Sequence, residues 1–239
     1  MTKNDLNQNG IYVQDLIDTI EPDFAFNNQP INRFKFNKPL GDKLSLDKKE
    51  QLSKLKAQIN SIENCNLKNN SNNLILGDGN INSPIMIIGE APDGNDDGLG
   101  KSFQGDVGAL LKKMFLAIEI EIEKIYLSYS VNFRPLEDRK PTSQEIKRYS
   151  VFLKEHISII NPKILILMGS TAMEAVTGLS SKISNERGKW KEIILNNKTI
   201  PFIITFNPSY LIRFPENKKY SWDDLKKIKQ KIIDLKVNI

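Results

Sequence analysis

The sequence has few of the side chains that usually hold metals or form disulfides. Among 239 residues there is one cysteine, Cys65, and one histidine, His156. A single cysteine excludes an intramolecular disulfide framework and suits a reducing compartment. One cysteine and one histidine give poor support for a zinc or iron–sulfur site, so the residues predict no metal. His156 lies in the helical stretch KEHISIINP, which favours a surface or structural role over Ser-His-Asp catalysis.

Long apolar runs are also absent. No stretch reaches membrane-spanning length, and the polar start MTKNDLNQNG lacks a signal-peptide core. We therefore expect a cytoplasmic protein with no membrane partner. We also expect a monomer. Charged residues make up 26% of the chain and the net charge is +5. This charge favours a polyanionic partner such as nucleic acid, although abundant lysine alone does not establish one.

Short apolar runs alternate with amphipathic stretches from Leu74 onward. The runs predict strands at 85–89, 125–129, 164–168 and 202–205. The stretches predict helices at 105–119, 143–160, 170–178 and 221–236. Thr142 and Glu145 suit a capping region before the second of these helices. The alternation predicts a three-layer α/β/α fold around a central, mostly parallel, four-stranded sheet.

The N-terminal part of the chain has a different composition. Residues 1–60 are predicted to form an N-terminal extension with a helix, of which residues 1–45 are polar and have little core of their own. Within it, a short amphipathic piece at 12–20 and a helix at 46–62 are predicted from apolar spacing. Residues 61–239 are predicted to form the α/β domain.

Each predicted strand ends in a polar loop, and all four loops should open on the same edge of a parallel sheet, where α/β proteins build their sites. The longest loop lies within residues 85–111, IMIIGEAPDGNDDGLGKSFQGDVGALL. Its Gly100-Lys101-Ser102 ends like a nucleotide P-loop. That motif needs glycine at position 95, which is asparagine, and the neighbouring aspartates would repel phosphates.

The carboxylates of this loop are the main candidates for chemistry. Glu90, Asp96 and Asp97 follow a buried strand, where a carboxylate can hold a water or stabilise positive charge. The alternative is that they cap the next helix and keep the loop solvated. Phe103 stands out in this polar loop because a flat apolar ring can stack on a planar ligand. Packing beneath the loop is the alternative role for that ring.

These motifs together resemble the uracil-DNA glycosylase superfamily, most closely the bacterial and archaeal group called family 4. The first family motif, Gly-Glu-Ala/Gly-Pro-Gly, then Glu-Asp and Gly-x-Pro-Phe, is similar to GEAPDGNDDGLGKSFQG at 89–105. The second, His-Pro-Ser-x-Leu-Leu-Arg, is similar to NPSYLIR at 207–213. RPLEDRKP at 134–141, Phe152-Leu153 and Arg187-Gly188 match further family motifs in the same order. The resemblance covers roughly residues 60–235.

The resemblance implies a DNA glycosylase that flips uracil or another deaminated base out of DNA and hydrolyses its N-glycosidic bond for base excision repair. It implies catalytic roles for Glu90, Asp96, Asp97 and Asn207. It implies base binding by Gly89, Ala91, Pro92, Phe103 and Tyr129, with Phe103 stacking on the base. It implies DNA contacts by Lys101, Arg134, Ser209, Leu211 and Arg213, with Leu211 as a wedge.

Several positions depart from the family pattern. The family's catalytic histidine is Asn207 here, and its uracil-reading asparagine is Tyr129. The motif-one glutamate is shortened to Asp96, and the glycine after proline is Asp93. Family 4 also carries a 4Fe–4S cluster on four cysteines. Only Cys65 matches a ligand position, and the other three fall on residues that cannot bind iron: Ile62, Phe133 and Tyr149. We expect no cluster and no other cofactor.

Three functions therefore stay open at the level of sequence. The first is glycosylase activity on DNA containing uracil or another deaminated base. The second is DNA binding without chemistry by a weak or inactive glycosylase fold, which predicts salt-dependent binding and no abasic product. The third is an unrelated α/β hydrolase.

Overall fold

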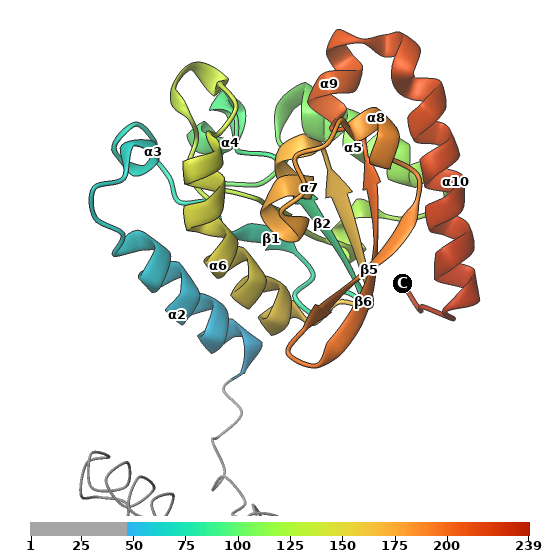
Figure 1. The fold of residues 1–239 in the computed structure, drawn as a ribbon, viewed down its shortest axis with the longest axis horizontal. Coiled ribbons are helices and arrows are strands. Elements are labelled where there is room, and N and C mark those ends of the chain that lie inside the picture. Colours follow the sequence, from blue (N-terminus) through green and yellow to red (C-terminus); the bar gives the residue numbers. More distant parts are fainter. Residues whose placement is uncertain (1–46) are drawn as a thin grey trace, which may run out of the picture. The chain divides into compact units, whose positions relative to one another are not determined.

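The computed structural model describes residues 47–239, which are built around one sheet (Figure 1). The strands are β1 (Gly77–Gly79), β2 (Ile85–Gly89), β3 (Tyr126–Tyr129), β4 (Ile164–Met168), β5 (Trp190–Leu195) and β6 (Lys198–Thr205). The helices are α2 (Lys48–Asn60), α3 (Asn66–Asn69), α4 (Gly94–Leu99), α5 (Gly105–Leu116), α6 (Ser143–Ile160), α7 (Ser170–Thr177), α8 (Ile183–Glu186), α9 (Pro208–Arg213) and α10 (Lys218–Asp234). Short 3₁₀ turns are η2 (Ile122–Lys124), η3 (Leu136–Asp138) and η4 (Pro215–Asn217).

The sheet has six strands in the order β1-β3-β2-β4-β6-β5, so the predicted number of four is wrong. The four predicted strands form its parallel centre, and β1 and β5 add antiparallel edges. Strand β1 is Gly-Asp-Gly and carries no apolar signal. Strand β5 joins β6 through Asn196-Asn197, both at positive φ, as tight hairpin turns require.

Two apolar layers cover the sheet, which confirms the three-layer α/β/α class. Successive strand residues point to opposite faces. Ile85 and Ile87 of β2 therefore pack with residues of α5 and α10, while Met86 and Ile88 pack with residues of α6 and α7. Figure 1 shows α6 and α7 on one side of the strands and α10 on the other. The central strands β2 and β4 are fully buried, as their uninterrupted apolar runs indicate.

The helix predictions differ in accuracy. Helix α6 has the predicted bounds because its start is set by a complete capping box. The Thr142 side chain accepts from the Glu145 N–H, and the Glu145 side chain accepts from the Thr142 N–H. Helix α4, in contrast, lies where an irregular loop was expected. A second capping box, formed by Asp93 and Asp96, starts it, and Gly100 ends it at φ 65°.

The predicted amphipathic piece at 12–20 lies outside the described residues. Helix α2 is present and packs on α6, with Leu52, Leu55 and Ile59 buried. A domain boundary at residue 60 stays a prediction. Within residues 47–239, none of the helices combines the length and apolarity that crossing a bilayer would require.

Candidate active site

The carboxyl ends of β2, β3 and β6 border a cleft of about 440 Å³. Parallel pairing sets this position, because Gly89 at the end of β2 lies beside Tyr129 at the end of β3. Nine of the predicted site residues line the cleft: Glu90, Ala91, Pro92, Asp96, Phe103, Tyr129, Asn207, Ser209 and Arg213. The predicted convergence of loops on one sheet edge therefore brings these residues together.

Glu90 and Asn207 meet across the cleft from different strands. The Asn207 Nδ2 donates to Glu90 Oε2 at 3.3 Å. Asn207 is the N-cap of α9, and its Oδ1 accepts from the Ser209 N–H, which directs the amide nitrogen toward Glu90. Glu90 Oε1 accepts from the Thr171 N–H at the start of α7, at 3.1 Å. Both carboxylate oxygens are thus held by donors from other loops.

Gly169 makes this placement of Glu90 possible. It has φ 100°, and a Cβ at this position would lie 2.5 Å from the Glu90 carboxyl carbon. Any larger residue would therefore clash with the carboxylate and be strained in its backbone. The short β4–α7 connection is thereby part of the site, even though its only sequence signal is the Gly-Ser pair after the strand.

Asp96 lines the cleft and is 1% exposed. Its Oδ2 accepts from the Tyr129 hydroxyl at 2.6 Å and from the Asp93 N–H at 3.0 Å, and its Oδ1 accepts from the Gln104 N–H at 2.7 Å. Burial raises the pKa of Asp96, while these donors act in the opposite direction. A carboxylate surrounded by donors can supply fixed negative charge.

Tyr129 and Phe103 form a stacked pair beside Asp96. Their ring centroids are 4.7 Å apart with an angle of 23° between the planes. The Tyr129 hydroxyl also accepts from the Phe103 N–H at 2.9 Å. Gly89 lies against this stack, and a Cβ there would lie 2.7 Å from the Phe103 ring. One face of Phe103 is therefore covered by a protein side chain, at a position where family 4 has asparagine.

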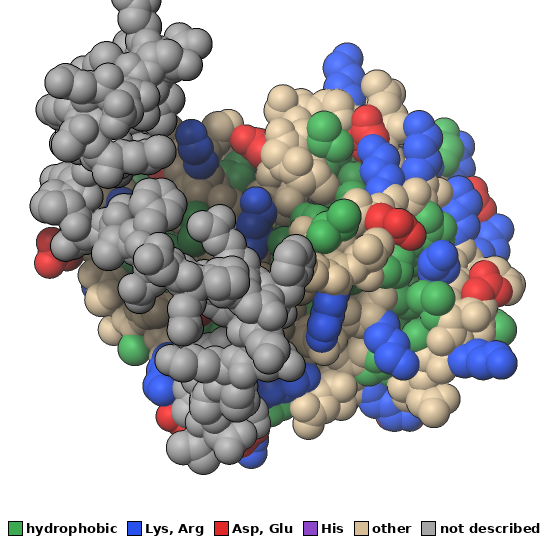
Figure 2. Space-filling model, turned by 60° about the horizontal axis from the view of Figure 1, so that its bottom comes forward, with side chains coloured by type: hydrophobic (Ala, Val, Ile, Leu, Met, Phe, Trp, Pro, Cys, Tyr) green, Lys and Arg blue, Asp and Glu red, His purple; other side chains and the backbone are tan. Residues whose placement is uncertain are grey.

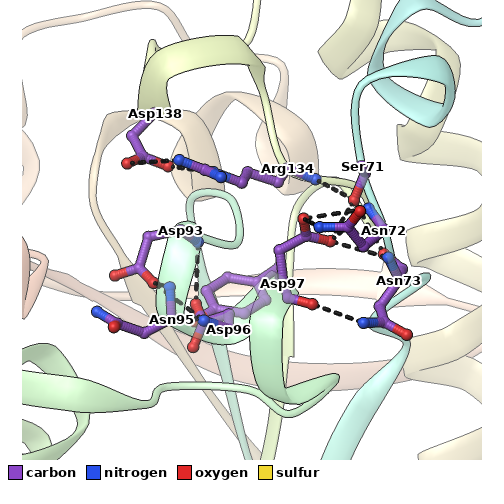
Figure 3. A network of polar contacts seen from close by, with 10 residues as sticks. Ser71, Asn72, Asn73, Asp93, Asn95, Asp96, Asp97, Arg134 and Asp138 are labelled. Atoms are coloured by element: carbon purple, nitrogen blue, oxygen red, sulfur yellow. Dashed lines mark hydrogen bonds and ion pairs between the residues drawn. The ribbon is translucent and has the colours of Figure 1, made fainter.

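Asp97 has a different environment from its neighbour. It lies outside the cleft and accepts from Ser71 Oγ, the Asn72 N–H and the Asn73 N–H at 2.7–2.9 Å, which joins α4 to the segment before β1 (Figure 3). Burial would raise the pKa of Asp97, but these hydrogen bonds outweigh it and lower that pKa. Successive helix residues differ by about 100° around the axis, so the two aspartates point in different directions.

The predicted DNA contacts divide between the cleft and other surfaces. Ser209 and Arg213 line the cleft, whereas Arg134 pairs with Asp138 at 2.7 Å beside it (Figure 3). Lys101 lines a separate hollow next to α5. Leu211 is 1% exposed and packs in the core, so in this conformation it does not project from the surface. Its role as a wedge stays a prediction.

Sequence reasoning missed part of the cleft wall. Asp138, Arg139, Lys140 and Pro141 line the cleft, and Lys140 Nζ lies 4.0 Å from Glu90 Oε1. The signal was available, because RPLEDRKP had been matched to a family motif. His156 is not among the residues that line the cleft. It is buried between α6 and β3, 2.9 Å from the Tyr126 hydroxyl, which agrees with the expected structural role.

At the positions where family 4 has its iron-binding cysteines, this chain has side chains that pack together in a buried, mainly apolar region. Cys65 Sγ lies 3.2 Å from the Tyr149 hydroxyl, and the Tyr149 ring meets Phe133 edge to face at 6.4 Å. These residues, with Leu55 and Val131, belong to one buried cluster. One thiol among aromatic and aliphatic side chains does not fit a 4Fe–4S cluster, which needs four thiolates. Across residues 47–239, no three His, Cys, Asp or Glu side chains are placed to hold a metal ion.

On the face that Figure 2 shows, positively charged side chains are not gathered at one place. Figure 2 shows Lys and Arg side chains interspersed with Asp, Glu and apolar groups over the visible face. Charge on this face therefore indicates no particular binding surface.

Comparison with known proteins agrees with the motifs. Residues 76–228 match the family model described as the Uracil DNA glycosylase superfamily. The chain is 34% identical to a type-4 uracil-DNA glycosylase of Thermotoga maritima, over 69% of this chain and 86% of that protein. It is 28% identical to a type-4 uracil-DNA glycosylase of Archaeoglobus fulgidus, over 75% of this chain and 92% of the relative. A DNA polymerase of Bacillus phage SP01 is 29% identical over 62% of this chain, but only 16% of the polymerase is covered. The resemblance inferred from the sequence is thereby confirmed, and the chain belongs to the uracil-DNA glycosylase superfamily.

Proposed function

We propose that this protein is a DNA glycosylase that hydrolyses the N-glycosidic bond of uracil, or of another deaminated base, in DNA. One observation carries the proposal: Glu90 and Asp96, which follow β2, and Asn207, which follows β6, line a single cleft at the carboxyl edge of the sheet. The relatives named as uracil-DNA glycosylases support it. All of these groups come from one chain, which is consistent with action as a monomer on DNA during base excision repair.

The cleft must receive a base that has left the DNA stack, because the bond to be cleaved is inaccessible in a duplex. As the bond breaks, positive charge develops on the sugar and negative charge on the oxygens of the departing base. Asp96 supplies negative charge in the cleft. The Asn207 amide supplies a neutral N–H donor in the same cleft, which suits an oxygen that gains charge.

Glu90 has a positioning role in this scheme. Its carboxylate holds the Asn207 amide nitrogen at 3.3 Å and is itself fixed by the start of α7. Ser209 and Arg213 line the same cleft and suit contacts to the DNA backbone. Tyr129 takes the place of the amide with which the family reads uracil. It offers a single hydroxyl, already bonded to Asp96, and this makes base preference the first question to test.

The test is single-turnover cleavage of oligonucleotides that carry one uracil, hypoxanthine or xanthine. Release of at least one base is expected, with the abasic product detected by strand cleavage in alkali. Glu90→Gln, Asp96→Asn and Asn207→Ala should each slow release. Glu155→Gln, an exposed glutamate of α6 outside the cleft, is the control and should match wild type. DNA binding without any abasic product would refute the enzyme and favour the non-catalytic alternative.

We also infer that the iron–sulfur cluster of family 4 has been lost. The contact between Cys65 and Tyr149 and the packing of Phe133 support replacement of the cluster by packed side chains. Purified protein should contain no stoichiometric iron or acid-labile sulfide, and Cys65→Ala should leave base release unchanged. Iron and sulfide at cluster stoichiometry would refute this inference.

A further inference from the structure

Two further hollows lie next to the cleft, beyond Asn207. A small hollow of about 100 Å³ shares Glu90 and Asn207 with the cleft. The same small hollow shares Phe206 and Tyr210 with a larger one of about 630 Å³. The three hollows are therefore neighbours, and we name the part beyond Asn207 the aromatic groove. Its lining residues include Ser170, Lys182, Ile183, Arg187, Phe206, Tyr210 and Tyr220.

Aromatic rings are prominent in the aromatic groove. Phe206 stacks on Tyr210 with centroids 5.0 Å apart, and Tyr210 lies 4.9 Å from Phe214. Tyr220 at the start of α10 is 42% exposed, and Phe214 is 45% exposed. A flat, partly exposed ring beside a hollow suits stacking on a planar ligand.

The Tyr220 ring is held in place before any ligand arrives. The Arg187 guanidinium lies 5.3 Å from the centre of this ring and 5.6 Å from that of Phe206. Arg187 is itself held by two hydrogen bonds that it donates to the buried Asp224 carboxylate and by one that it donates to the Tyr220 carbonyl. A ring fixed in this way loses little freedom when a base stacks on it.

The charge of the groove suits a polyanion. Lys182 lines it, Lys219 Nζ lies 5.0 Å from the Tyr220 ring, and Arg213 lines the passage from the cleft. Among the described residues that line the passage and the groove, Glu90 is the one acidic side chain. Several serines, Ser180, Ser181 and Ser184, also line it and can donate to phosphate oxygens.

We propose that the aromatic groove binds an unpaired stretch of DNA next to the target nucleotide, with one flanking base stacked on Tyr220. The inference rests on the proposed function in that the target base occupies the cleft. Stacking platforms combined with basic side chains are how proteins hold single strands without reading their sequence. Stacking on Tyr220 requires a base released from pairing, so the groove favours single-stranded over duplex DNA.

The test measures binding of the full chain to single-stranded oligonucleotides that carry one uracil, by fluorescence anisotropy. Tyr220→Ala should weaken binding roughly five- to tenfold, the lower end of the range for one stacked base. Trp222→Ala is a matched control, because Trp222 is 44% exposed on the same helix but does not line the groove. It should bind as wild type does, and so should Tyr220→Phe, which keeps the ring.

A scan of the DNA locates the stacked base. Nucleotides around the uracil are replaced one at a time by a stable abasic residue. In wild type, one flanking position should cost about as much affinity as Tyr220→Ala, and at that position the variant should show no further loss. The scan of wild type alone still tests the proposal if Tyr220→Ala fails to fold.

Two results would overturn the proposal that the aromatic groove binds DNA. One is equal affinity of Tyr220→Ala and Trp222→Ala, and the other is an abasic scan in which no flanking position matters. Either result can occur while uracil is released normally, in which case the proposed function stands without the groove. Coupling between Tyr220 and one flanking base in the absence of base release would instead keep the groove and refute the glycosylase.

Discussion

The Tyr129 hydroxyl is the group whose removal tests the site most directly. It donates to the buried Asp96 carboxylate at 2.6 Å and accepts from the Phe103 N–H at 2.9 Å. Tyr129→Phe keeps the ring and its stack on Phe103 but removes both hydrogen bonds. The variant therefore separates the polar contribution of this residue from its packing.

The expected cost follows from these two bonds. A hydrogen bond to a charged group contributes about 1.5–3 kcal/mol, and a neutral one about 0.5–1.5 kcal/mol. Their loss should lower the free energy of unfolding by about 3 kcal/mol. For a unit of this size, that corresponds to a fall in melting temperature of about 6–12 °C. Tyr210→Phe is the control, since its half-buried hydroxyl contacts only the Asn217 side chain, at 3.2 Å, and should cost far less.

Activity gives a second, independent readout of the same variant. Burial raises the pKa of Asp96, and the Tyr129 hydrogen bond counteracts that rise. Without the hydroxyl the pKa rises further, so the carboxylate is protonated at a higher pH. If ionised Asp96 is needed, the acidic limb of the single-turnover rate should move to higher pH in Tyr129→Phe. An unchanged melting temperature with an unchanged acidic limb would refute the network around Asp96.

Other substitutions probe the remaining groups. Asn207→Ala should reduce single-turnover base release about a hundredfold, equivalent to about 3 kcal/mol, with unchanged affinity for DNA that lacks the target base; a uniform loss of binding would contradict this role. Asp97→Asn should lower the free energy of unfolding by about 2 kcal/mol, seen as a lower melting temperature. It should leave the rate of base release per folded molecule unaltered. Burial lowers the pKa of His156 from 6.5 to about 3, so the unfolded chain binds a proton below pH 6.5 that the folded chain does not. The free energy of unfolding should therefore fall by about 2 kcal/mol between pH 6.5 and 5. In denaturant titrations over this pH range, His156→Gln should not show this fall.

The residues predict much of the scaffold because its signals are local. Continuous apolar runs at 85–89 and 164–168 predict strands buried on both faces, and that is where β2 and β4 lie. The capping box at Thr142 and Glu145 determines where α6 begins. Strand β1 and the helix α4 were missed, because a Gly-Asp-Gly strand depends on pairing with β3 and a glycine-rich helix on its caps.

The site, too, could be predicted only where its signals are local in the sequence. The sequence alone determined that four loops share one sheet edge, since parallel strands leave no other arrangement, and its motifs identified the superfamily. Only the tertiary structure decided that Asp96 enters the cleft, while Asp97 accepts hydrogen bonds from the segment before β1. It also decided that Tyr129 covers one face of Phe103 and that Leu211 lies in the core. The physical reason is that these outcomes depend on contacts between residues far apart in the chain, which local spacing does not encode.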